Sequence, residues 1–138
     1  MHNSVAQDAS RKRTPEAVTL DSNILIAYLV GERRVIDILT GWKREGRVLL
    51  TSAISVAEVL ALSALDSEAV ERIRLFLRGF VSIPFDDELA VTAGALARRY
   101  GLKLADAAIA ATALTRQVPL VTRDEHFQRV RKIVVVAI

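Results

Sequence analysis

The sequence predicts an α/β fold in which helices cover both faces of a parallel sheet. Five short apolar runs alternate along the chain with longer segments whose apolar residues recur at helical spacing. Parallel strands need crossover connections, and helical crossovers lie on the faces of the sheet. The chain has 138 residues, of which 51% are hydrophobic and 25% charged, which suits one domain with a buried core. We expect that domain to span residues 17–138.

The first segment of the domain is predicted to be strand, helix, helix. The run 18–20 is short and apolar, as in a buried strand. Ser22 can cap the helix that follows, and Gly31 closes it. A second helix over residues 32–45 has its apolar side chains on one face and ends at Gly46.

The middle of the domain is predicted to repeat this alternation. Residues 47–51 form a strand, and a helix opened by Ser52 continues through Leu65. Ser67 caps a further helix, and residues 80–83 form the third strand. The stretch 48–65 is as long as a short membrane span, but the charge of Glu58 near its middle favours a buried core and no membrane partner.

The last segment is predicted to be a helical pair followed by two strands. Three acids, Asp86-Asp87-Glu88, open a helix that ends near Gly101, and their position is typical of capping rather than of a metal site. A helix over 104–116 follows. The strands at 119–122 and 133–137, with a short helix between them, complete the sheet.

Residues 1–16 are predicted to form a flexible polar and basic leader. They contain Arg11-Lys12-Arg13 and no apolar stretch like that of a signal peptide, so we expect a cytoplasmic protein. The chain has no cysteine, which excludes disulfides, zinc–thiolate sites and cysteine nucleophiles. The net charge of +3 permits a polyanionic partner without requiring one.

Four acidic residues stand in otherwise apolar surroundings: Asp21, Glu58, Asp106 and Asp124. Asp21 and Asp124 each follow a predicted strand, at the edge of a parallel sheet where ligands bind. A buried carboxylate is costly without a cation, and basic residues near these four are few. We therefore expect a metal ion, and oxygen ligands favour Mg²⁺ or Mn²⁺. Such a site predicts metal-assisted hydrolysis of a phosphodiester.

Other residues able to do chemistry have simpler explanations. The only histidines, His2 and His126, are interpreted as surface residues, and neither has a serine placed to form a nucleophilic triad. Among basic residues that could line an RNA path, Arg123 is favoured because it adjoins Asp124. The other candidates for that path are Arg98, Arg99, Lys103 and Arg116.

Four segments read together resemble a known family. They are Leu20-Asp21-Ser22-Asn23-Ile24-Leu25, Ser55-Val56-Ala57-Glu58-Val59-Leu60, Leu104-Ala105-Asp106-Ala107-Ala108-Ile109 with the alanine-rich residues after it, and Val121-Thr122-Arg123-Asp124-Glu125-His126-Phe127. In order and spacing they resemble the signatures of the PIN-domain nucleases and, more narrowly, of the VapC-type toxin ribonucleases of toxin–antitoxin pairs. The resemblance covers about residues 17 to 137.

The resemblance implies a three-layer α/β/α domain with a five-stranded parallel sheet and an acidic pocket at its rim. It implies that Asp21 and Asp106 are the firmest metal ligands, and that Glu58 and Asp124 complete the pocket directly or through water. Thr122 and Asn23 would support these ligands from behind. It further implies an endoribonuclease that cuts single-stranded RNA and leaves a 5′-phosphate, a cognate antitoxin and a homodimer.

Two other functions compete with this one. A receiver or phosphatase site needs paired acids or Asp-x-Asp plus a later lysine, whereas the first site here reads Asp21-Ser22-Asn23 and residues 118–123 hold no lysine. A non-catalytic module that binds RNA or a protein remains the alternative to the nuclease.

Overall fold

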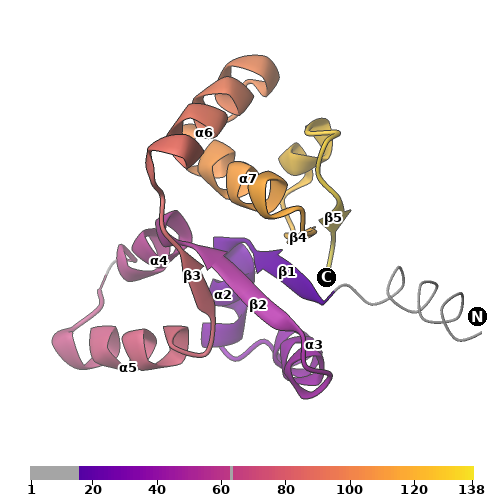
Figure 1. Ribbon diagram of the computed structural model, residues 1–138. Helices are drawn as coiled ribbons and strands as arrows, with labels where there is room; N and C mark the ends of the chain where they lie inside the picture. The colour runs from indigo at the N-terminus through magenta and orange to yellow at the C-terminus, as the bar shows by residue number, and fades with distance from the viewer. Residues whose placement is uncertain (1–15, 63) are drawn as a thin grey trace, which may run out of the picture.

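The computed structural model describes residues 16–62 and 64–138, so nearly all of the predicted leader lies outside the described residues. A five-stranded sheet, with strand order β3-β2-β1-β4-β5, forms the centre of the domain (Figure 1). Every neighbouring pair is parallel. The strands are β1 (Ala17–Leu20), β2 (Val48–Ser52), β3 (Val81–Ile83), β4 (Leu120–Val121) and β5 (Val135–Val136).

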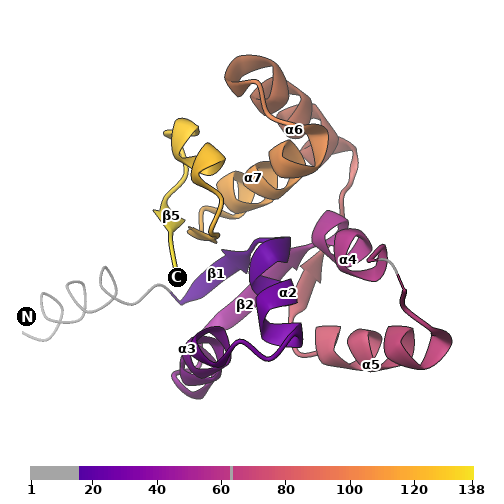
Figure 2. The same ribbon diagram turned by 180° about the vertical axis from the view of Figure 1, so that it is seen from behind.

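The crossovers between these strands are helical, as the sequence predicts. The helices are α2 (Ser22–Leu29), α3 (Arg33–Arg44), α4 (Ala53–Leu60), α5 (Ser67–Leu77), α6 (Asp87–Tyr100) and α7 (Leu104–Arg116), and a short 3₁₀ helix η1 covers Glu125–Arg129. Both views of the ribbon show α6 and α7 packed together, apart from α3 and α5 (Figures 1 and 2). None of the helices in the described residues has the length and apolar character needed to span a bilayer.

Two hydrophobic cores lie on opposite faces of the sheet. Neighbouring side chains of a strand point to opposite faces, so Leu49 packs in one core and Leu50 in the other. Leu120 and Val121 of β4 divide in the same way. The first core contains residues of α2, α3 and α5, and the second contains residues of α6, α7 and η1. The predicted three-layer α/β/α arrangement is thus confirmed.

The predicted helix over 52–65 is too long. Helix α4 ends at Leu60, and Ala64 has a left-handed backbone with φ of 65°. The chain turns there to begin α5, although the apolar sequence contains no glycine or proline at that point. Hydrophobic composition alone therefore does not mark this helix end.

Two predicted helix caps are displaced by one residue. Asp21, not Ser22, occupies the N-cap of α2, and Asp66, not Ser67, caps α5 through a 2.7 Å bond from the Ala69 N–H. A carboxylate is a stronger acceptor for these unpaired amides than a hydroxyl, and it also interacts favourably with the helix dipole. At α7 the predicted and observed bounds agree.

Candidate active site

Asp21 is fixed at the carboxyl end of the central strand. Its backbone N–H donates to the Val121 carbonyl of the neighbouring β4 at 2.9 Å. Its side chain is 4% exposed, and both carboxylate oxygens accept hydrogen bonds. Oδ1 accepts from the Ser22 N–H at 2.7 Å, and Oδ2 accepts from the Thr122 hydroxyl at 2.6 Å. The carboxylate therefore has one fixed orientation.

Burial raises the pKa of Asp21 above its ordinary value, because the charged form loses hydration. The hydrogen bonds from Thr122 and Ser22 oppose this rise, whereas the negative charge of Asp106 adds to it. These hydrogen bonds therefore offset only part of the cost of burying the charged carboxylate. A cation close to Asp21 would offset the remaining cost of burying its charge.

Glu58 reaches the same place from α4. Its Oε1 accepts a 2.7 Å hydrogen bond from the Ser22 hydroxyl. The same hydroxyl lies 3.3 Å from Oδ1 of Asp21, so Ser22 stands between two of the four predicted acids. The sequence pattern predicted a helix cap at Ser22 and gave no indication of this contact. The available signal was a hydroxyl directly after an acid in an apolar segment.

Asp106 lies in the first turn of α7 and is half-buried. Its pKa is raised by burial first, and then by the negative charges of Asp124 and Glu58. The charge of Asp106 also raises the pKa of Asp21, so Asp106 interacts electrostatically with each of the other three acids. The structure thus brings the four predicted acids into one electrostatic cluster with Asp106 as its common member.

Asp124 caps η1 and belongs to a different local environment. Its Oδ1 accepts from the His126 backbone N–H at 2.9 Å and lies 2.6 Å from Nδ1 of the His126 ring. These contacts with His126 lower the pKa of Asp124, with the backbone hydrogen bond as the largest cause. The His126 ring is exposed, as predicted, yet it contacts one of the candidate ligands.

Thr122 connects the two strand-end acids. Its hydroxyl donates to Asp21 and accepts from the Asp124 N–H at 2.9 Å. Asn23 approaches the same hydroxyl with Nδ2 at 3.5 Å, and its buried Oδ1 has no hydrogen-bond partner within the described residues. Thr122 thus contacts two of the acids directly, whereas Asn23 reaches them only through Thr122.

A pocket of about 240 Å³ opens beside Asp106 and Asp124. The other side chains in its lining are Leu102, Lys103, His126 and Arg129, with Gly101 at its edge. Acidic and basic side chains therefore both line this pocket. Arg129 and His126 were not among the residues that the sequence suggested for RNA binding, since nothing in their local pattern distinguishes them from solvated charges.

The guanidinium of Arg123 is paired with Glu32. It forms a two-pronged ion pair with Glu32, in which Nη1 lies 2.8 Å from Oε2 and Nη2 contacts Oε1. Its Nε also donates to the Ile138 carbonyl at 3.2 Å. The predicted contact of Arg123 with RNA would have to compete with this ion pair.

The donor chemistry of the cluster fits a hard divalent cation, because all four candidate ligands are carboxylates. Their mutual repulsion also favours an added positive charge. In the side-chain positions shown, however, no three Asp, Glu or His residues of ranges 16–62 and 64–138 are arranged to hold a metal ion. The residues are thus of the right type and in one neighbourhood, but they do not converge on a single point.

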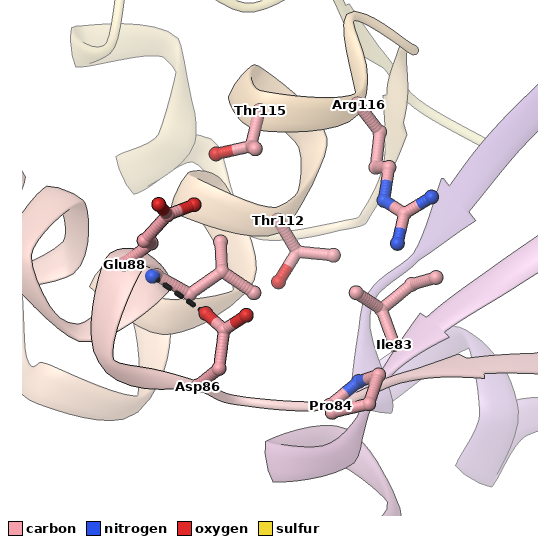
Figure 3. A pocket seen from close by; sticks show the side chains of 8 residues that line it. Ile83, Pro84, Asp86, Glu88, Thr112, Thr115 and Arg116 are labelled. Atoms are coloured by element: carbon pink, nitrogen blue, oxygen red, sulfur yellow. Dashed lines mark hydrogen bonds between the residues drawn. The ribbon is translucent and has the colours of Figure 1, made fainter.

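A second pocket, of about 360 Å³, lies between the start of α6 and the end of α7 (Figure 3). Its lining includes Asp86, Glu88, Thr115 and Arg116. Oδ1 of Asp86 accepts a 2.9 Å bond from the Leu89 N–H and so caps α6. The predicted capping role of this acidic run is confirmed for Asp86.

With the fold and the acidic cluster established, comparison with known proteins identifies the class. The model of the PIN domain family matches residues 18–133. The chain therefore belongs to the PIN domain family. No curated protein matches it by sequence.

Solved structures extend this likeness to toxin–antitoxin systems. The chain is 32% identical to a chain of a toxin–antitoxin complex from Klebsiella pneumoniae, with a TM-score of 0.74 and coverage of 86% of this chain and 95% of that one. It is 27% identical to a chain of FitAcB from Neisseria gonorrhoeae, with a TM-score of 0.66 and coverage of 86% and 95%. DNA-bound VapBC from Salmonella typhimurium shares the fold, at 23% identity, a TM-score of 0.71 and coverage of 88% and 97%. The predicted resemblance to PIN-domain proteins of toxin–antitoxin pairs is confirmed.

Proposed function

We propose that this protein is a Mg²⁺- or Mn²⁺-dependent endoribonuclease that hydrolyses RNA phosphodiesters. One observation carries the proposal. In this PIN domain, four carboxylates from distant parts of the chain form one cluster, in which Asp106 interacts electrostatically with the other three. A cluster of mutually repelling acids lowers the stability of the domain, and such clusters are typical of functional sites. A catalytic metal site accounts for this one.

Each acid has a proposed role. Asp21 and Asp106 would hold the metal ion, with Asp124 as a further ligand. A bound divalent ion supplies Lewis acidity that activates water and stabilises the charge that develops on the phosphate. Glu58 would position the attacking water, because its Oε1 is held by Ser22 while its other oxygen has no hydrogen bond to the described residues. Thr122 and Asn23 would keep the ligands in place.

We further propose that the protein is the toxin of a toxin–antitoxin pair, acts in the cytoplasm and forms a homodimer. The likeness to a chain of a toxin–antitoxin complex supports a cognate antitoxin. Co-purification with the product of an adjacent small gene, followed by restored cleavage after its removal, would support the assignment. Full activity in the presence of that product would contradict it.

The test of the nuclease uses end-labelled single-stranded RNAs incubated with Mg²⁺, Mn²⁺ or EDTA. The native protein is compared with an Asp21→Asn/Asp106→Asn double variant and with an Asp87→Asn/Glu88→Gln control, which removes the same charge from an exposed site. Metal-dependent cleavage by the native and control proteins, absent from the double variant, is expected. Equal cleavage by all three would reject this site.

A non-catalytic RNA- or protein-binding module is the second candidate. It is favoured by the finding that the described acids do not converge on one metal position. RNA binding that persists in every metal condition, with no cleavage by antitoxin-free native protein, would establish it.

A further inference from the structure

Two basic side chains share the pocket with two of the acids. Lys103 precedes α7, and Arg129 ends η1, so they come from segments that are far apart in sequence. Both line the 240 Å³ pocket together with Asp106 and Asp124. We call Lys103 and Arg129 the basic wall of this pocket.

Neither member of the basic wall is engaged in an ion pair within the described residues. Arg123 and Arg47, by contrast, form ion pairs with Glu32 and Glu45. Lys103 occupies the N-cap position of α7 without forming a side-chain capping bond. Neither an ion pair nor a capping bond within the described residues therefore occupies these two charges.

The basic wall nevertheless acts on the acids of the same pocket. The positive charge of Lys103 works to lower the pKa of Asp106, and that of Arg129 works to lower the pKa of Asp124. The cations are thus within electrostatic range of the acids without forming ion pairs with them. The pocket that these four side chains line has room for several water molecules.

An RNA strand that enters this site meets strong repulsion, since each phosphate is negative and the site has four carboxylates. Cations beside the acids reduce that repulsion and give the strand a fixed path. Arg123, the residue favoured by sequence, is held by Glu32, whereas the basic wall faces the pocket.

We propose that Lys103 and Arg129 bind the backbone phosphate of single-stranded RNA next to the linkage that is cut. The inference rests on the proposed nuclease function and deepens it by assigning the substrate contacts of the same pocket. An acidic side chain of a protein partner is the competing occupant, but its binding would not require the wall to lie beside the acids.

The test compares a Lys103→Gln/Arg129→Gln variant with an Arg131→Gln/Lys132→Gln control. The control removes one lysine and one arginine from exposed positions that do not line the pocket. Binding of a fluorescent single-stranded RNA is measured by anisotropy in EDTA, in an Asp21→Asn background, over a range of salt concentrations. Cleavage kinetics are measured without the Asp21→Asn substitution.

The wall variant should bind RNA about tenfold more weakly than the control, and the slope of log affinity against log salt should fall by about 0.7, the value for one neutralised phosphate on a single strand. In cleavage, KM should rise by a similar factor with kcat within about twofold. A Lys103→Arg/Arg129→Lys variant should restore affinity, since it keeps both charges.

Three results would overturn the proposal: equal affinity and slope in wall and control variants, no RNA binding by either, or a loss confined to antitoxin binding. The last result would show that Lys103 and Arg129 bind an acidic side chain of the antitoxin instead of RNA. Failure of the nuclease function is distinguishable, because it would leave wall-dependent RNA binding intact while native protein cleaves nothing in Mg²⁺ or Mn²⁺.

Discussion

The hydroxyl of Thr122 donates to Oδ2 of Asp21 at 2.6 Å, although 101 positions separate the two residues. The bond is buried and joins the residues that directly follow β4 and β1. It stabilises the charged form of Asp21 against the effect of burial. One hydroxyl therefore contributes both to the join between the two strands and to the charge state of a candidate ligand.

Replacing Thr122 by valine should lower the free energy of unfolding by about 1–3 kcal/mol, because it leaves buried polar groups of Asp21 and Asp124 without a partner. Urea denaturation at neutral pH measures the change. Thr115→Val is the control, since its exposed side chain makes no hydrogen bond to the described residues. Equal effects of the two substitutions would contradict the prediction.

The raised pKa values of Asp21 and Asp106 predict how stability depends on pH in EDTA. A carboxyl whose pKa is higher in the folded state stabilises the fold most below its ordinary value of 3.8, and this contribution is lost as pH rises through the folded-state pKa. Asp21→Asn/Asp106→Asn should therefore raise Tm by a few degrees at pH 7. Asparagine also remains a good helix cap.

This gain in Tm should shrink as the pH falls toward 3.8, because the native acids are then protonated as well. Thermal unfolding of both proteins from pH 3.5 to pH 8 follows the difference. A gain that stays constant over this range would show that charge is not its cause. Asp87→Asn, at an exposed site, should give no comparable gain.

Glu58→Gln should reduce the single-turnover cleavage rate about 100-fold or more, because the amide cannot act as a base toward water. The amide oxygen can still accept the bond from Ser22, so the fold should be unchanged. Ser22→Ala should cost less, about tenfold, since Glu58 keeps its charge and loses only its orientation. A Ser22→Ala loss as large as that of Glu58→Gln would show that Ser22 does more than position Glu58.

Divalent metal should stabilise the native protein by mass action. At a free Mn²⁺ concentration about 100 times the dissociation constant, the expected gain is about 2.7 kcal/mol, and EDTA should reverse it. Calorimetry or thermal unfolding with increasing Mn²⁺ measures the effect. Asp106→Asn should abolish it and Asp87→Asn should not. An unchanged response in Asp106→Asn would place the metal elsewhere.

Glu32→Gln should release Arg123 and strengthen RNA binding a few-fold, with a salt slope steeper by about 0.7 for one added phosphate contact. Anisotropy with a short single-stranded RNA measures both quantities. Glu45→Gln, which breaks the ion pair of Arg47, is the matched control. If the gain persists after Arg123→Gln is added, the predicted RNA contact of Arg123 is wrong.

Local pattern was sufficient where one strong signal decided the structure. Helix α7 has the predicted bounds, and its residues 107–113 form one continuous buried segment. The strand pattern also predicted that two of the four acids, Asp21 and Asp124, lie at one rim, because parallel strands end on the same edge of a sheet.

Pairings between distant residues could not be predicted in the same way. The Arg123–Glu32 ion pair joins positions 91 residues apart, and the sequence around neither residue indicates which partner it binds. The position of Ser22 between Asp21 and Glu58 likewise depends on how α4 lies beside α2. Such contacts follow from packing, which a single sequence does not specify.

The pairing of β4 with β1 has a consequence for the order in which the site can be assembled. The backbone of Asp21 binds the carbonyl of Val121, and Asp124 follows three residues later. During synthesis, the N-terminal acid is therefore made roughly a hundred residues before the strand that completes its surroundings. A growing chain that has not yet released residues 120–124 has no complete acidic cluster, so the proposed nuclease cannot act on RNA before these residues have left the ribosome.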